Sequence, residues 1–160
     1  MNNKIKKITL FFLLILITLV LVSAYIIEYK LGYQPCKLCI YQRIPYFFSI
    51  LLIANLIFVK KHEKITYLIL FLVFAFSSVL AFYHFGIEQG FFNESFLCSI
   101  GDQFNTLSKE EILEQFKQNS IGCREVNFKI FGLSLATINT IFSLILSVIF
   151  IRLFLSYGKN

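Results

Sequence analysis

Two cysteines separated by two residues, Cys36 and Cys39, form the part of the sequence with the clearest potential for chemistry. They lie in the stretch PCKLCIYQRIPY, at residues 35–46, directly before a long apolar run. A disulfide between such close neighbours closes only a very short loop, so it constrains the unfolded chain little. The spacing therefore favours thiol–disulfide chemistry, and a pair of inert structural disulfides is the alternative interpretation.

The residues that follow Cys39 favour a reactive thiolate. Pro45 has no N–H, which is harmless in the first turn of a helix, so we expect a helix to begin near residues 41–44. A helix N-terminus and a nearby cation both favour the thiolate form of cysteine. If the helical turn extends back, Arg43 lies on the same face as Cys39, one turn away.

The elements that must position these residues are four long apolar runs. The chain has 160 residues, of which 58% are hydrophobic and 15% charged, whereas soluble domains carry about 25% charged residues. Roughly 20 apolar residues in a helix cross a bilayer core. The runs predict an all-α membrane protein, a four-transmembrane-helix bundle in one domain over residues 1–160. The expected spans are about 8–27, 41–59, 65–87 and 130–151. The first run is longer than the apolar core of a cleaved signal peptide, so we expect it to be retained.

The distribution of lysine and arginine predicts the orientation of these spans. With four spans, residues 1–7, 60–64 and 152–160 share one side of the membrane, and their basic residues far outnumber the single acidic residue, Glu63. The loops at 28–43 and 88–129 carry basic and acidic residues in nearly equal numbers. Because basic residues concentrate on the cytoplasmic side, both termini are expected there. The net charge of +6 is thus a topology signal, and no nucleic-acid partner is expected.

All four cysteines fall in the two non-cytoplasmic loops, where disulfides persist. Four cysteines allow three pairings. We favour pairs of nearest neighbours, Cys36–Cys39 and Cys98–Cys123, for the resting protein. A zinc site would need a second closely spaced Cys/His pair, and haem attachment would need a histidine after Cys39. The sequence has neither, so no metal is expected.

Three further features have both a chemical and a structural interpretation. Arg43 at the membrane edge could only set topology, but its place on the non-cytoplasmic side favours a function. His84 lies near the outer end of the third span, where an ionisable residue is a candidate for function or for packing. Residues 107–118, LSKEEILEQFKQ, predict a short amphipathic helix that rests on the membrane surface or packs within the loop. Small and polar residues of the fourth span, Asn139 among them, are expected at helix–helix contacts.

Together, the motif P-C-x-L-C-x-x-Q-R before the second span, the four spans and the later cysteine pair resemble the bacterial disulfide bond formation protein B (DsbB) family. The segments YHFGIEQGFF at 83–92 and FGLSLATIN at 131–139 are similar as well. The resemblance covers the chain from about residue 8 to residue 151. One difference is that this chain contains no tryptophan.

The resemblance implies an enzyme of the bacterial inner membrane, with its cysteines in the periplasm. A reduced DsbA-like thioredoxin-fold protein would pass electrons to Cys98–Cys123, and these would move on to Cys36–Cys39. The final acceptor would be a membrane quinone, ubiquinone or menaquinone, bound near Arg43 and His84. Arg43 would stabilise the thiolate and the negative charge that develops on the quinone oxygen.

Two other functions remain open at this stage. A vitamin K epoxide reductase-like thiol oxidase is also a small quinone-linked bundle, but in that family the loop cysteines precede the C-x-x-C pair. A non-enzymatic four-span scaffold would use both cysteine pairs as structural disulfides and would give Arg43 no role. Both a general oxidant and a paralogue dedicated to one substrate fit the sequence.

Overall fold

The computed structural model describes residues 3–59, 62–93, 98, 122–124, 128–130 and 132–157. Its elements are α1 (Asn3–Tyr29), α2 (Lys37–Tyr41), α3 (Ile44–Phe58), α4 (Glu63–Glu88), β1 (Lys129–Ile130), β2 (Leu133–Ser134) and α6 (Leu135–Ser156). The amphipathic helix expected at residues 107–118 lies outside the described residues.

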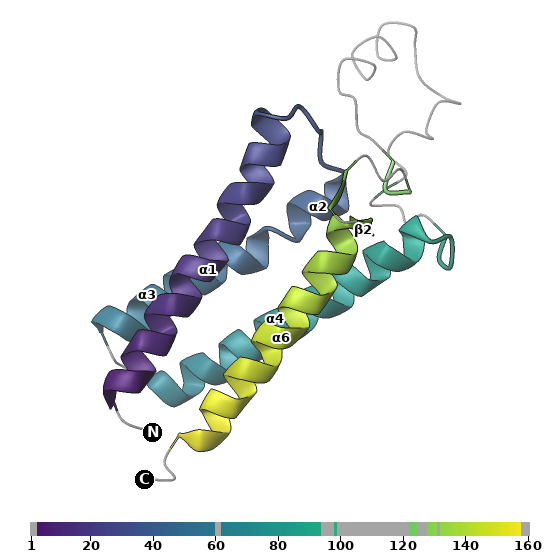
Figure 1. Cartoon of the computed structure of the whole chain (residues 1–160). Helices are drawn as coiled ribbons and strands as arrows, with labels where there is room; N and C mark the ends of the chain where they lie inside the picture. Colours follow the sequence, from purple (N-terminus) through teal and green to yellow (C-terminus); the bar gives the residue numbers. More distant parts are fainter. Residues whose placement is uncertain are drawn as a thin grey trace, which may run out of the picture.

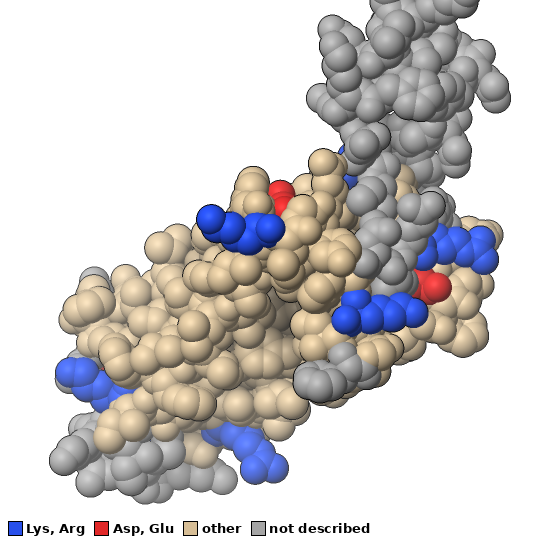
Figure 2. Space-filling view, turned by 45° about the horizontal axis from the view of Figure 1, so that its top comes forward, with Lys and Arg blue, Asp and Glu red and all other residues tan. Residues whose placement is uncertain are grey.

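Within the described residues, four helical stretches are long and apolar enough to cross a membrane: Lys6–Tyr29, Lys37–Phe58, Glu63–Glu88 and Leu135–Ser156. Their outer faces expose large apolar side chains, which suits contact with lipid rather than water. Figure 2 shows charged side chains toward the two ends of the visible face, with uncharged surface between them. The expected mostly helical fold with four spans is confirmed.

The helices pack in two pairs, α1 with α3 and α4 with α6, and α3 also contacts α4. The first residues of α1 and the last residues of α6 lie at the same end of the bundle, whereas α2 and the β1–β2 hairpin lie at the other end (Figure 1). Aromatic rings of Tyr46, Phe74 and Phe150 fill the core between α3, α4 and α6. The residues with chemical potential therefore lie at one end of a packed bundle.

The second span departs from its expected start near residue 41. Helical structure begins earlier, at Lys37, and is interrupted at Gln42 and Arg43 before α3 begins. The interruption follows from Pro45, which has no N–H to donate to the carbonyl of Tyr41 and whose ring would collide with it. As a result, the turn that carries both cysteines is a separate helix, and Gln42 and Arg43 occupy the junction.

The fourth span begins five residues later than expected, at Leu135 rather than at residue 130. The preceding residues form the antiparallel hairpin of β1 and β2, whose turn contains Gly132 at a φ of +81°. This left-handed conformation is easily adopted only by glycine. Ser134 then starts the helix, because its Oγ accepts a hydrogen bond from the N–H of Thr137 at 3.2 Å.

Candidate active site

Cys36 occupies the N-cap of α2, and its sulfur takes the place of a capping oxygen. The Sγ atom of Cys36 accepts a hydrogen bond from the N–H of Cys39 at 3.3 Å, and the two Sγ atoms lie 2.8 Å apart. Two expectations are corrected here. The cysteines are thiols in this structure, not the expected disulfide. Because helix α2 starts early, the thiol at the helix N-terminus is that of Cys36, not that of Cys39.

The environment of Cys36 favours the thiolate. The hydrogen bond from the Cys39 thiol has the largest effect, and His84 adds a hydrogen bond at 3.4 Å between Nε2 and Sγ. These interactions outweigh burial and lower the pKa of Cys36 from 9.0 to about 5. Cys36 is therefore ionised at neutral pH, and Cys39 supplies one of its hydrogen-bond donors.

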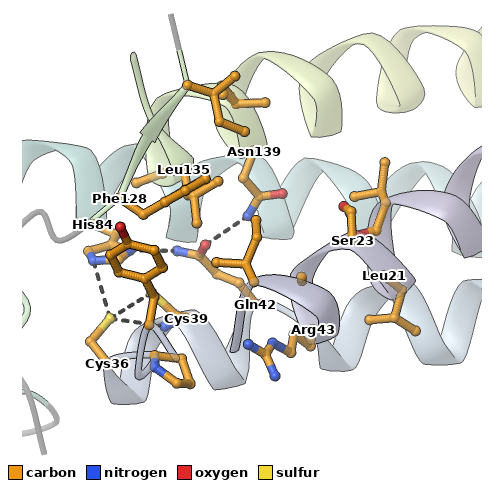
Figure 3. Close-up of a pocket in the computed structure, with 18 of the residues that line it drawn as sticks. Leu21, Ser23, Cys36, Cys39, Gln42, Arg43, His84, Phe128, Leu135 and Asn139 are labelled. Carbon is orange, nitrogen blue, oxygen red and sulfur yellow. Dashed lines mark hydrogen bonds between the residues drawn. The ribbon is translucent and has the colours of Figure 1, made fainter. Parts of the chain in front are cut away.

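A chain of hydrogen bonds fixes the ring of His84. The Nε2 of Gln42 lies 3.2 Å from Nδ1 of His84, and the Oε1 of Gln42 accepts a bond from Asn139 Nδ2 at 2.8 Å. The Tyr46 hydroxyl donates in turn to Oδ1 of Asn139. Since the amide nitrogen of Gln42 can only donate, Nδ1 of His84 must accept. The ring proton is therefore on Nε2, which faces the sulfur of Cys36 (Figure 3).

The hydrogen-bond chain continues into the core. The Tyr46 hydroxyl lies 3.1 Å from the Ser143 hydroxyl, which lies 3.3 Å from that of Ser77. Asn139 of α6 thus links Gln42 to Tyr46 of α3, so the expectation that it lies at a helix–helix contact is confirmed. Sequence reasoning passed over Gln42 and Tyr46 as site residues. Their signal was available, because polar groups inside apolar spans must find partners away from water.

Glu88 is a further site residue that sequence reasoning missed. The Oε1 atom of Glu88 lies 3.7 Å from Nε2 of His84, which precedes Glu88 by one helical turn. The side chain of Glu88 is only 6% exposed. Among the described residues, its Oε2 atom has no hydrogen-bond partner. The spacing of four between His84 and Glu88 on one helix face was the signal that could have revealed this pair.

A cavity of about 310 Å³ lies beside these residues, and Cys36, Cys39, Arg43 and His84 all line it. Apolar side chains form most of its remaining wall: Val20, Leu21 and Ile27 from α1, and Leu135, Ile138 and Phe142 from α6. Figure 3 shows the cysteines and His84 on one side of this lining and Leu21 and Ser23 on another. The cavity thus joins the thiol pair to the space between two membrane-spanning helices.

Arg43 has two partners on α1. Its guanidinium forms a salt bridge with Glu28 and lies 4.7 Å from the ring centre of Tyr25. The two charged side chains are partly exposed, at 14% for Arg43 and 21% for Glu28. The structure therefore places Arg43 on the same cavity as Cys39, as the motif suggested, but adds a carboxylate partner that the sequence did not indicate.

Cys98 and Cys123 form a disulfide with a Cα–Cα distance of 5.6 Å, the expected pairing. Cys123 is buried in the apolar cluster that contains Cys36 and Ile87, and Cys39 and Cys98 pack against this cluster. All four cysteines therefore gather around the end of α4. Two neighbouring pairs, one oxidised and one reduced, are suited to exchanging a disulfide between them.

Comparison with known proteins identifies the family. A family model described as disulfide bond formation protein DsbB matches residues 6–153. An uncharacterized protein of Rickettsia prowazekii (strain Madrid E) is 32% identical over 152 residues, which cover 92% of this chain and 88% of that protein. With four helices that can span a membrane, this is a multi-pass membrane protein. The chain belongs to the DsbB family of disulfide bond formation proteins.

Proposed function

We propose that this chain is a quinone-dependent thiol oxidoreductase that reoxidises a DsbA-like dithiol protein of the bacterial periplasm. The observation that carries the proposal is the position of the Cys36 and Cys39 thiols in the wall of an apolar cavity between α1 and α6. Thiols in such a place can deliver electrons to an acceptor that is soluble in lipid.

The arrangement of the ends supports an orientation in the inner membrane. The termini of α1 and α6 lie at one end of the bundle, and the α2 cysteine turn lies at the other (Figure 1). Among the described residues, the basic side chains of Lys6 and Lys64 lie at the end with the termini, over the rings of Tyr157 and Phe154. By the preference of basic residues for the cytoplasmic side, the termini are cytoplasmic and the cysteines periplasmic.

The cavity fits a quinone. Its volume of about 310 Å³ is at the lower end of the range of about 300–1,000 Å³ for small-molecule sites. The apolar wall suits a flat ring, and Arg43 offers a cation to a carbonyl oxygen. Ubiquinone and menaquinone share these features. A bound quinone accepts two electrons and two protons, and these come from the dithiol of the partner through the two cysteine pairs.

The cysteine pairs support a defined order of exchange. A thiolate of the partner attacks Cys98 and releases Cys123, and the resolving thiol of the partner then completes its own disulfide. The two electrons pass to the inner pair when Cys123 attacks Cys36 of a Cys36–Cys39 disulfide and releases Cys39. Cys98 then re-forms its bond with Cys123, which leaves the inner pair as thiols. The structure has this combination, an oxidised outer pair and a reduced inner pair.

The alternatives have less support. The family match favours DsbB over a vitamin K epoxide reductase-like oxidase. A scaffold with two structural disulfides would have no use for the hydrogen bonds that converge on the Cys36 sulfur.

The proposal is tested by turnover with purified components. We expect the chain in detergent to reduce a short-chain ubiquinone or menaquinone when it is supplied with a reduced thioredoxin-fold partner, followed by quinone absorbance. Cys39→Ser should abolish turnover, whereas His62→Ala, at the opposite end of α4, should not. Absence of cysteine-dependent turnover with both quinones would refute the proposal.

A further inference from the structure

Four side chains with metal-binding atoms converge where α2 begins and α4 ends. The Sγ atoms of Cys36 and Cys39 and Nε2 of His84 all lie within 4.8 Å of one another. Glu88 adds a carboxylate oxygen 3.7 Å from the same Nε2. The two helix ends thus supply the donor group that the sequence lacked, because the fold brings His84 beside a cysteine pair far from it in the chain.

Two of the distances in this group match those between ligand atoms around a tetrahedral ion. With bonds of about 2.3 Å to sulfur and about 2.0–2.2 Å to nitrogen and oxygen, ligand atoms around zinc are separated by about 3.4–3.8 Å. Cys36 Sγ lies 3.4 Å from His84 Nε2, which lies 3.7 Å from Glu88 Oε1. The two sulfurs, 2.8 Å apart, must separate by about 1 Å, which rotation of one cysteine side chain can provide. The Glu88 carboxylate must also turn toward the sulfurs, because the atoms that lie within 4.8 Å of one another belong to Cys36, Cys39 and His84.

Glu88 is the member of this group with an unused ligand atom, although Ser134 hydrogen-bonds to its carboxylate and Lys129 attracts it. Its side chain is 94% buried, and Oε2 has no hydrogen-bond partner among the described residues. A buried carboxylate without a full set of partners is costly. A divalent cation held between Glu88 and two thiolates would offset two of their three negative charges.

The hydrogen-bond chain behind His84 can serve the metal-bound ring as well. Binding through Nε2 requires the ring proton to be on Nδ1, and this proton would be donated to Oε1 of Gln42 after its amide turns over. Gln42 would then donate to Oδ1 of Asn139, and Asn139 to the Tyr46 hydroxyl. The same four residues, Gln42, His84, Asn139 and Tyr46, therefore fit either direction of hydrogen bonding.

We propose that Cys36, Cys39, His84 and Glu88 form a site for a thiophilic divalent cation of the Zn²⁺ type, present only when the cysteine pair is reduced. Binding displaces the proton of the Cys39 thiol, and oxidation of the pair to a disulfide removes two of the four ligands and releases the ion. The consequence for activity rests on the proposed function: the bound ion occupies both thiolates and stops electron transfer.

Co²⁺ is the probe for the test, because tetrahedral cobalt–thiolate centres have characteristic visible and charge-transfer bands. The full-length chain with Cys98→Ser and Cys123→Ser leaves only the inner pair. We expect this protein, reduced and freed of reductant without oxygen, to bind one equivalent of Co²⁺ with tetrahedral bands that Zn²⁺ removes. Oxidation of the same sample with diamide should abolish the bands without any further substitution.

Matched variants then identify the ligands. His84→Ala and Glu88→Gln in the same background should weaken Co²⁺ binding by about 10- to 100-fold or more, and His62→Ala should not change it. Gln42→Glu should strengthen binding, because a carboxylate is a better acceptor for the Nδ1 proton. No tetrahedral bands in the parent protein, or bands unchanged by both His84→Ala and Glu88→Gln, would overturn the site.

These binding measurements contain neither quinone nor partner, so their result is independent of the proposed function. In the turnover assay, low concentrations of Zn²⁺ should inhibit the wild-type chain, and a chelator should restore its rate. The Co²⁺ displacement measurement gives the Zn²⁺ concentration that saturates the site. Full turnover at that concentration would show that the bound ion does not stop electron transfer, and would refute that part of the proposal.

Discussion

The two polar groups on the cavity wall, His84 and Arg43, are held in very different ways. The side chain of His84 is 97% buried, and its ring is oriented by a hydrogen-bond chain that runs through α2, α3, α4 and α6. Arg43 has one carboxylate and one aromatic ring as partners, both on α1, and its side chain is partly exposed. One side of the cavity is thus fixed in a single geometry, and the other is held by a clamp of two residues.

This difference suggests separate roles for His84 and Arg43. Moving His84 would leave several buried polar groups without partners, each at a cost of about 1–3 kcal/mol. Moving Arg43 breaks a partly exposed ion pair, which is worth about 1 kcal/mol or less. His84 is therefore suited to set the ionisation of Cys36, and Arg43 is suited to change partners when an acceptor enters.

The largest expected effect is on the pH dependence of Cys36 alkylation. The lowered pKa of about 5 means that Cys36 loses its proton well below the ordinary value of 9.0. In the Cys98→Ser, Cys123→Ser protein with chelator present, alkylation by N-ethylmaleimide should be half-maximal near pH 5, followed by mass spectrometry. The thiolate stabilises the fold above pH 9, and this contribution is lost as pH falls to 5.

Substitutions test whether His84, and not Arg43, controls the ionisation of Cys36. Cys39→Ala and His84→Ala should both move the midpoint to higher pH, because each removes a hydrogen bond to the thiolate. Arg43→Ala should leave the midpoint where it is. If Arg43→Ala shifts the pH midpoint and His84→Ala does not, the roles assigned to these two residues are wrong.

The second prediction concerns the rate of turnover. A hydrogen bond to a charged group contributes about 1.5–3 kcal/mol, so His84→Ala should lower kcat by about 10- to 100-fold. The apparent KM for quinone should change little, because the hydrogen bond is made to the protein sulfur. Stopped-flow measurement of quinone absorbance gives both constants. An unchanged kcat would reduce His84 to a packing residue.

The third prediction concerns binding of the acceptor. Arg43→Ala should raise the apparent KM for quinone by about 10-fold, since a charge-assisted hydrogen bond to the acceptor is lost. Cys36 should keep its low pKa, and the amount of protein in the membrane should be unchanged. Unaltered quinone kinetics would return Arg43 to the role of a topology determinant.

The sequence predicts the membrane spans more completely than it predicts the site. The lengths of the apolar runs predicted four spans, because bilayer thickness fixes the number of residues required. The C-x-x-C motif and its arginine placed Cys39 and Arg43 at one cavity. Local rules also explain the two shifted boundaries after the fact: Pro45 interrupts the second span, and Gly132 and Ser134 delay the fourth.

The partners within the site were not predictable in the same way. Glu28, Gln42 and Asn139 lie on three different spans, and nothing in the periodicity of one helix shows which polar residue of another it will face. Their contacts depend on how α1 packs on α3 and α4 on α6. The rule that polar groups within a membrane need partners would have singled them out as a set. It would not have paired them.

The smallest expected effect is that of Glu28 on the apparent KM for quinone, and its sign shows how Glu28 acts on Arg43. Glu28 either holds Arg43 ready for the acceptor or competes with the acceptor for the guanidinium. Because the pair is partly exposed and worth about 1 kcal/mol or less, its loss should change the apparent KM by no more than about 5-fold. Our comparison predicts competition, so Glu28→Gln should lower the KM for quinone.

Tyr25→Leu, which removes only the ring, serves as the matched control for disturbance of α1. In Arg43→Ala protein, Glu28→Gln should have no further effect, since the guanidinium through which it acts is gone. A KM that rises in Glu28→Gln would show that the carboxylate positions Arg43, and both sides of the cavity would then be preorganised.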